Sequence, residues 1–510
     1  MTSAVKFLGV LVGGVLLGVG AFTWWSGADD DALLAAAPSA STTVGGPPAT
    51  SGPPDETTTT TTSSTTTTTT VPTAGVGEPY GEGLVMFRGN PTRNFYGTGP
   101  ISESPSQLWR YPESGMCGTS TNLGETKVWC GMGWTGQPAV HTREDGVTEL
   151  IFGAYDGAVH FVDAETGADL RPIFPTGDLI KGSVTIDPDG FPLLYFGSRD
   201  NKFRILALDR EEPTEIWSLD AYAVDGIWND DWDANPLIVD DIMYQGGENG
   251  WFFIYKLNRS IGSDGLVSVD PELLFSMRGY DDELISNSGT NVSIESSAVM
   301  SEGRVYFANS GGRVLGLDVS NVASGEAPVV FDYYAGGDID ATIVVDAEGF
   351  LYVPIENEPS QMGSVESARN KEVGQLVKLD PLTEGDPRVW GLDLTAQGDS
   401  GLWATPALYG DMLYVNTHTG ELIAVDKNTG EIVWRDQVGF HSWSSPAVVD
   451  GTLVVATCTG ELRGYSLADP RSPTRLWTLP LGEACLEATP AIWEGTIFLG
   501  SRDGYIRAFR

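Results

Sequence analysis

The sequence predicts an all-β fold: an eight-bladed β-propeller of four-stranded blades that follows one transmembrane helix and a disordered stalk. Three observations lead to this prediction. Past residue 85, short strands with alternating apolar residues, separated by Gly-containing turns, recur at intervals of 40 to 64 residues. The composition of 63 Gly and only 19% charged residues suits many strands and turns. The last repeat ends after three strands, so a strand from elsewhere must complete it.

Residues 1–30 are predicted to form an uncleaved membrane anchor. Residues 7–25 carry no charge, and about 20 apolar residues span a bilayer as a helix. Lys6 precedes this run and Asp29–Asp31 follow it, which predicts a single pass through the cell membrane with the propeller on the extracytoplasmic side. A cleaved signal peptide is the alternative, because residues 33–40 are rich in small side chains.

Residues 31–84 are predicted to form a disordered linker. The run TTTTTTSSTTTTTT at residues 57–70 lies within a stretch of Pro, Ala, Gly, Ser and Thr. Such a stretch has too little apolar mass to build a core. We therefore expect a low-complexity stalk that separates the membrane from a folded head at residues 85–510.

The repeat is clearest in SSPAVVDGTLVVATCTGELRGYSLADPRSPTRLW at residues 444–477, and residues 404–434 form a second copy. Each copy contains three apolar strands and a fourth strand that ends in Trp. The apolar residues alternate with period two, which indicates strands rather than helices. First-strand anchors define eight units, at Pro138, Val184, Pro236, Ser297, Thr342, Pro406, Pro446 and Pro490.

The strand missing from the last unit is available near the start of the folded part. SQLWRY at residues 106–111 contains the Trp of a fourth strand, and the first full unit begins only at Trp134. We predict that residues 106–111 complete the last blade. This N-terminal strand would close the ring and remove the exposed edges of an open sheet.

The charge of the chain narrows the classes of partner. It contains 69 acidic and 29 basic side chains, for a net charge of −40 at neutral pH. A nucleic-acid backbone would be repelled, so nucleic acid is excluded as a partner. Cations and basic peptides fit this charge better. A second interpretation of the net charge is that the acidic surface serves only solubility.

AVDKNTGEIVW at residues 424–434 resembles the tryptophan-docking repeat of the quinoprotein-like, or PQQ-repeat, propellers. Partial copies occur at residues 207–217 and 378–390. The resemblance covers residues 85–510 and implies that fourth-strand indoles dock adjacent blades, at Trp109, Trp217, Trp390, Trp434 and Trp477. The family includes alcohol dehydrogenases that bind pyrroloquinoline quinone (PQQ) and cofactor-free propellers of outer-membrane assembly. The repeat therefore implies the fold more strongly than a function.

The dehydrogenase branch of this family uses a disulfide between adjacent cysteines and a calcium site of Glu, Asn and Asp. This chain has no adjacent cysteines, no CxxCH haem motif, no P-loop and no nucleophile elbow. We therefore expect no catalytic residues and no resident cofactor, and we do not expect PQQ to bind. Calcium remains a candidate ligand.

The four cysteines are predicted to form two disulfides, because the extracytoplasmic compartment is oxidising. Cys117 and Cys130 lie in one connection between a fourth strand and the next first strand. Cys458 lies in a turn between second and third strands and Cys485 in a fourth-to-first connection. These two kinds of loop share one face of a propeller. The predicted pairs are Cys117–Cys130 and Cys458–Cys485, with other pairings left open.

DGIWNDDWDANP at residues 225–236 is the densest group of acids and indoles, and it lies in a fourth-to-first connection. Equivalent connections bring acidic and aromatic residues to the same rim around the ring axis. The predicted ligand rim consists of Trp134, Trp228, Asp230, Asp231, Trp232, Asp233, Glu295, Asp340, Trp403, His441, Trp443 and Glu487. Its carboxylates suit calcium or a basic group, and Trp228, Trp232, Trp403 and Trp443 would form an aromatic wall. The alternative is that these residues only cap turns and pack blades.

We therefore expect a membrane-anchored extracytoplasmic propeller that acts as a non-catalytic binding or assembly scaffold in the cell envelope. Its expected partners are envelope proteins or peptides, with glycans as a second class, and the propeller is expected to be a monomer. The alternative function is that of a quinone- or calcium-dependent oxidoreductase of the quinoprotein dehydrogenase type with an altered site.

Overall fold

The computed structural model describes residues 77–122, 125–133 and 136–510. The predicted anchor and the linker up to residue 76 lie outside these residues. Within the described part, no helix is long and apolar enough to cross a membrane. The described residues, apart from Asn122 and Glu125, belong to one compact unit, whose fold is given below.

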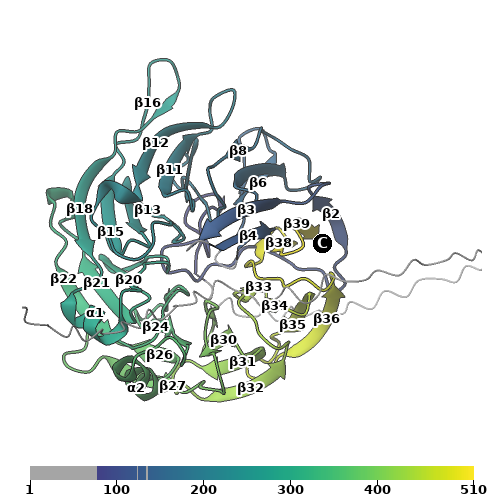
Figure 1. Cartoon of the computed structure of the whole chain (residues 1–510). Helices are drawn as coiled ribbons and strands as arrows, with labels where there is room; N and C mark the ends of the chain where they lie inside the picture. Colours follow the sequence, from purple (N-terminus) through teal and green to yellow (C-terminus); the bar gives the residue numbers. More distant parts are fainter. Residues whose placement is uncertain (1–76, 123–124, 134–135) are drawn as a thin grey trace, which may run out of the picture. The chain divides into compact units, whose positions relative to one another are not determined.

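The eight predicted blades are confirmed, and Figure 1 shows their sheets arranged in a ring. Blade 1 consists of β5 (Ala139–Thr142), β6 (Thr148–Gly153), β7 (Ala158–Asp163) and β8 (Phe174–Pro175), with β1 (Gly83–Leu84) added beside β5. Blade 2 consists of β9 (Thr185–Ile186), β10 (Leu193–Gly197), β11 (Lys202–Ala207) and β12 (Thr214–Asp220). Blade 3 consists of β13 (Leu237–Val239), β14 (Ile242–Gly246), β15 (Trp251–Lys256) and β18 (Glu272–Arg278). Blade 4 consists of β19 (Val299–Ser301), β20 (Arg304–Ala308), β21 (Arg313–Asp318) and β22 (Val329–Tyr334).

The second half of the ring continues the same antiparallel order. Blade 5 consists of β23 (Val344–Val345), β24 (Leu351–Pro354), β26 (Leu376–Leu379) and β27 (Arg388–Leu392). Blade 6 consists of β29 (Ala407–Tyr409), β30 (Met412–Asn416), β31 (Glu421–Asp426) and β32 (Ile432–Gln437). Blade 7 consists of β33 (Ala447–Val449), β34 (Thr452–Ala456), β35 (Glu461–Ser466) and β36 (Thr474–Pro480). Blade 8 consists of β37 (Ala491–Trp493), β38 (Thr496–Ser501), β39 (Tyr505–Phe509) and β2 (Gln107–Tyr111).

The ring closes as predicted, because the N-terminal strand β2 pairs antiparallel with the C-terminal strand β39. Trp109 of β2 then reaches blade 1, where its indole Nε1 donates to the carbonyl of Ala164 over 3.1 Å. Gly167 makes room for this indole, since a Cβ there would lie 2.8 Å from the ring. The strand β2 therefore joins the two ends of the ring. It pairs with β39 inside blade 8, and its Trp109 docks onto blade 1.

The other predicted docking indoles follow this arrangement with one variation. Trp390 donates to the carbonyl of Lys427 in blade 6 over 3.0 Å. Trp217 and Trp434 pack edge-on against Tyr255 and Tyr465 of the following blades. Trp477 instead covers Gly464 on the neighbouring strand of its own blade.

The antiparallel order of each blade divides the loops between two faces. First-to-second and third-to-fourth turns leave on one face, and second-to-third turns and blade-to-blade connections leave on the other, which we call the connection face. The connection-face loops contain the hairpin of β3 (Cys117–Asn122) and β4 (Glu125–Cys130), η1 (Ala221–Ala223), α1 (Asp282–Ser288), β25 (Glu356–Asn357), α2 (Ser364–Val373) and β28 (Ser400–Gly401). The hairpin of β16 (Ser260–Ile261) and β17 (Val267–Ser268) and η2 (Val322–Ser324) belong to the opposite face.

Residues 84–98 form an axial segment that contacts all eight blades, a feature the repeat analysis did not predict. The blade residues that it pairs or hydrogen-bonds with lie in or directly before the first strands, at Val140, Ile186, Asn235, Met300, Val345, Pro406, Pro446 and Ile492. Because every first strand contributes a backbone or amide group to the same short segment, this segment occupies the centre of the ring.

Two fully buried arginines fix the axial segment. Arg88 donates to the carbonyls of Pro406, Thr405 and Pro446 over 2.6, 2.8 and 2.7 Å. Arg93 donates to the carbonyl of Ala298 over 3.1 Å and to its own segment at Phe87. Burial lowers the pKa of Arg88 to about 10 and that of Arg93 to about 9, so both remain cationic at neutral pH. Backbone carbonyl dipoles solvate these charges in place of water.

The chain enters the propeller on the face opposite the connection face. The amide of Gly77 donates to the carbonyl of Asn94 in the axial segment. Gly81 then packs against Pro188, in the first-to-second turn of blade 2. Gly83 and Leu84 pair with the first strand of blade 1, so regular structure begins just before residue 85. The described residues 77–84 therefore lie on the side of the ring away from the connection face.

Arg88→Met should lower the free energy of unfolding by about 3 kcal/mol or more, because it leaves three buried carbonyls without donors. Arg110→Met is the matched control, since Arg110 is exposed on β2 and its guanidinium lies over the Tyr505 ring. The control should change stability by less than about 1 kcal/mol. Urea unfolding followed by tryptophan fluorescence measures both, and equal midpoints would contradict a central role for Arg88.

Candidate functional site

Eight carboxylates lie on the connection face, and the sequence placed four of them on the ligand rim. Asp231 and Asp233 come from the β12–β13 connection, Glu295 from the β18–β19 connection and Asp340 from the β22–β23 connection. Four further carboxylates complete this group, which we call the acidic cluster: Glu248 in the β14–β15 turn, Asp338 beside Asp340, and Glu356 and Glu358 in the β24–β26 connection. Burial and mutual repulsion raise the pKa of Glu295 well above its usual value, with Asp340 as the largest charged contributor.

Lys181 lies inside one part of the acidic cluster. Its ammonium forms an ion pair with Asp233 and lies 3.2 Å from Glu248 and 3.7 Å from Asp231. Burial opposes its charge, but Asp233 and Glu248 outweigh this effect and raise the pKa of Lys181 well above its usual value. Arg199 donates from Nε to Asp231 over 2.6 Å. This part of the cluster therefore contains its own counterions.

A second part of the acidic cluster consists of Asp338, Glu356 and Glu358. Glu356 belongs to β25, and Glu358 follows it in the segment that leads to α2. Burial, followed by repulsion from neighbouring carboxylates, raises the pKa of Asp338 and Glu356 well above their usual values and that of Glu358 to about 8. Within the described chain, no lysine or arginine forms an ion pair with these three residues.

Aromatic and imidazole rings form a second group on the same face, the aromatic cluster of Trp403, His418, His441 and Trp443. The Trp443 indole donates to Nδ1 of His418 over 2.9 Å, and the Trp403 and His418 ring centroids lie 3.9 Å apart. Burial, followed by the proximity of His441, lowers the pKa of His418 to about 4. His418 is therefore neutral at pH 7 and serves as an acceptor for the indole.

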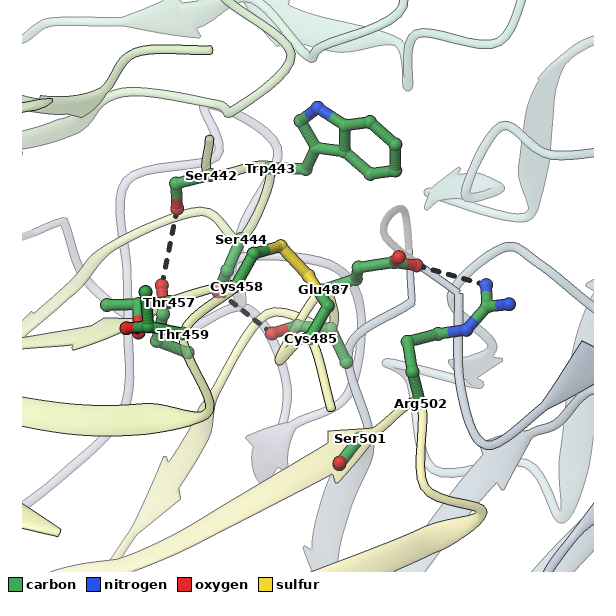
Figure 2. Close-up of a disulfide and its surroundings, with 12 residues drawn as sticks. Ser442, Trp443, Ser444, Thr457, Cys458, Thr459, Cys485, Glu487, Ser501 and Arg502 are labelled. Atoms are coloured by element: carbon green, nitrogen blue, oxygen red, sulfur yellow. Dashed lines mark hydrogen bonds and ion pairs between the residues drawn. A yellow bond between two sulfur atoms is a disulfide. The ribbon is translucent and has the colours of Figure 1, made fainter. Parts of the chain in front are cut away.

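Both predicted disulfides are confirmed, Cys117–Cys130 and Cys458–Cys485. The second joins the β34–β35 turn to the β36–β37 connection and lies beneath the Trp443 ring in Figure 2. In the same view, the Glu487 carboxylate points to Arg502, and their charged atoms lie 3.2 Å apart. The Arg502 guanidinium also lies over the rings of Trp129 and Tyr155. The disulfide and this ion pair link the connection-face loops of blades 7 and 8.

Two described residues of the predicted rim, Trp232 and Asp230, lie outside both clusters. Trp134 falls outside the described residues. Trp232 does not belong to an aromatic wall, because it is fully buried against Phe203 and Phe253 between blades 2 and 3. Asp230 points away from the acidic cluster, where Tyr222 hydrogen-bonds it. Alternate residues of DDWD therefore diverge, since neighbouring side chains of an extended segment point to opposite sides.

Sequence reasoning missed Lys181, Glu248, Asp338, Glu356, Glu358 and His418. Glu248 and His418 occupy second-to-third turns, which share the connection face with the blade connections. Their position in turns on this face was the sequence signal that could have identified them. Glu356 and Glu358 lie in an insertion without a repeat equivalent, so no periodicity could place them.

Exposed apolar side chains also occur on the loops of the connection face. Trp228 is 37% exposed in the β12–β13 connection, where it has a positive φ. Further exposed apolar side chains on connection-face elements are Val128, Tyr222, Val365 and Phe440. The face therefore combines carboxylates near the axis with apolar groups on its loops.

The sequence comparisons match parts of this chain. The family described as outer membrane protein assembly factor BamB matches residues 372–510. The assembly factor BamB of Nitrosomonas eutropha is 30% identical over 142 residues, which cover 27% of this chain and 32% of that protein. Quinoprotein alcohol dehydrogenase PedH of Pseudomonas putida is 30% identical over 88 residues, which cover 15% of this chain and 14% of the dehydrogenase. The chain thus spans about a third or less of either relative.

The crystal structure of the computationally designed Ika8 protein matches 73% of this chain and 95% of its own, with a TM-score of 0.50 and 11% sequence identity. This likeness concerns the fold alone. The family match, the curated relatives and the eight blades together confirm the resemblance to the PQQ-repeat propellers.

Lys181→Met should destabilise the protein by about 3–5 kcal/mol at pH 8, because it removes the counterion of buried carboxylates. The loss should be smaller at pH 5, since Asp231 and Glu248, whose pKa values burial already raises, can then take up protons. Lys202→Met, at the partly exposed start of β11, is the control. Urea midpoints at both pH values test this, and a loss independent of pH would contradict the assignment of Lys181 as counterion.

Proposed function

Because the chain is a PQQ-repeat-type propeller, we propose that it is a non-catalytic scaffold that binds envelope proteins through its connection face. The similarity to outer membrane protein assembly factors supports a role in assembly at the cell envelope. Residues 1–30 would anchor it as a single-pass protein in the cell membrane, with residues 31–76 as the stalk and a monomeric propeller on the extracytoplasmic side.

This proposal rests on a difference between the two faces of the propeller: the described chain begins on one face, and exposed apolar side chains lie on the other. The chain enters on one face, beside Gly77 and Gly81. The opposite face bears the exposed apolar side chains of Trp228 and Phe440. Ion pairs of Asp231 with Arg199 and of Asp233 with Lys181 hold the loop of Trp228 in place. Exposed apolar groups on a rigid face are typical of a protein-binding surface.

The chemistry of this face favours a basic, amphipathic partner segment. Apolar side chains on the outer loops can bury a partner's apolar face, and the acidic cluster can attract its lysines or arginines. The net charge of −40 adds a long-range attraction for the same basic partner. Glycans remain a second class of partner, for which aromatic side chains such as Trp228 would supply stacking surfaces.

A quinone-dependent oxidoreductase is the alternative that the dehydrogenase relatives raise. PQQ carries several carboxylates, so its site must supply cations. On the connection face, Lys181, Arg199 and Arg502 each already pair with a carboxylate. The Cys458–Cys485 disulfide joins two separate loops rather than adjacent residues. These residues do not fit the cofactor, and no reaction step is assigned to it.

A photo-crosslinking amino acid at Phe440 or Tyr222 should capture an envelope protein in cells that produce the full-length chain. These side chains are 63% and 66% exposed on the connection face. The matched controls are Leu382 and Ile261, which are 58% and 54% exposed on the opposite face and should give no equivalent adduct. Mass spectrometry of the adducts identifies the partner. Equal capture from both faces, or from neither, would contradict the proposed surface.

Purified full-length protein mixed with PQQ and calcium should elute from gel filtration without a bound quinone chromophore. It should also fail to reduce an electron-accepting dye when alcohols or sugars are supplied. The reason is that the carboxylates of the acidic cluster repel an anionic cofactor. Retention of one PQQ per chain with substrate-dependent dye reduction would favour the oxidoreductase instead.

A further inference from the structure

Asp338, Glu356 and Glu358 bring three carboxylates to one point from two segments of the chain. One oxygen from each lies within 4.8 Å of the others. Calcium binds oxygen ligands at about 2.3–2.6 Å, so oxygens on opposite sides of one ion are about 4.6–5.2 Å apart. The three oxygens therefore fit within a single calcium coordination sphere.

Two of these carboxylates have buried oxygens without a partner. Glu356 is only 2% exposed, and its Oε1 accepts no hydrogen bond; the same holds for Oδ1 of Asp338. The other oxygen of Asp338 accepts a bond from Asn291 over 3.3 Å, and Oε1 of Glu358 accepts one from Gln361 over 3.0 Å. A buried carboxylate oxygen without a donor is costly, which points to a ligand that supplies positive charge.

The Lys181 part of the acidic cluster provides an internal comparison. Asp231, Asp233 and Glu248 also bring three oxygens within 4.8 Å of one another, and there the lysine ammonium lies among them. In the described chain no basic side chain takes the equivalent position beside Asp338, Glu356 and Glu358. Two triads of similar geometry thus differ in whether the protein supplies the cation.

We propose that Asp338, Glu356 and Glu358 bind one hard divalent cation of the calcium class. The set contains only carboxylates, and none of its members belongs to the rim that the sequence predicted. Water and the second carboxylate oxygens would complete the coordination.

The backbone around the triad is held rigidly, as a metal site requires. Asn370 of α2 donates from Nδ2 to the carbonyl of Glu356 over 2.7 Å and to that of Gly336 over 3.0 Å. The amide of Glu356 donates to the carbonyl of Asp338 over 2.9 Å. Gly337 permits this approach, because a Cβ there would lie 2.6 Å from the Glu356 carbonyl oxygen. The ligand segments are therefore fixed to each other without help from a metal.

Calcium titration of the full-length protein at pH 8 tests the site by calorimetry and by the melting temperature in calcium against EDTA. We expect one ion per chain and a melting temperature that rises with calcium concentration. Glu356→Gln should weaken calcium binding at least about tenfold. In EDTA, the same variant should melt at or above the wild-type temperature, because it removes one repelling charge. A merely structural Glu356 would not produce this pair of effects.

Glu149→Gln is the matched control, since Glu149 is equally buried but pairs with Arg171 and His141 in blade 1. It should lower the melting temperature and keep the calcium response. Should Glu356→Gln fail to fold, Asp338→Asn replaces it with the same expectations. Absence of calcium binding by the wild type at millimolar concentration, or equal binding by the variant, would overturn the proposal. A larger response to magnesium than to calcium would overturn the assignment to the calcium class.

Discussion

The ring depends on one interaction: the hydrogen bonding of its first strands to the axial segment. Eight strand starts converge on the axis with polar backbone groups that water cannot reach. Arg88 and Arg93 satisfy several of these groups in blades 4, 6 and 7 at once. Because a single segment bonds to every blade, the sequence before the repeats determines how the repeats meet. The axial segment also closes the ring centre beneath the acidic cluster.

The blades and their closure could be predicted because strand periodicity and turn residues are local signals. The pairing of β2 with β39 followed from counting strands, and the Cys458–Cys485 disulfide from knowing which loops share a face. The axial segment has no such signal, since Arg88 and Arg93 look like surface residues and lie outside the repeat. Lys181 and Glu356 were missed for the same reason: single side chains in loops acquire partners only when the ring closes. Trp232 was wrongly predicted to lie on the rim, because side chains that are close in the sequence need not point to the same site.

The acidic charge on the connection face is accommodated in two different ways. Part of the acidic cluster is neutralised by Lys181 and Arg199, and its stability is then a matter of buried ion pairs. The part around Glu356 has raised pKa values instead, so it holds protons or attracts cations from outside. In the aromatic cluster beside it, His418 is neutral at pH 7, because burial lowers its pKa to about 4. One face therefore offers three environments to a partner: carboxylate, imidazole with indole, and exposed apolar loops.

The entry of the chain beside the axial segment has a mechanical consequence. Gly77 bonds to Asn94 close to the centre of the ring rather than to an outer strand. A pull on the preceding chain is therefore transmitted through the axial segment to all eight blades at once, and no outer strand such as β2 is peeled from its sheet.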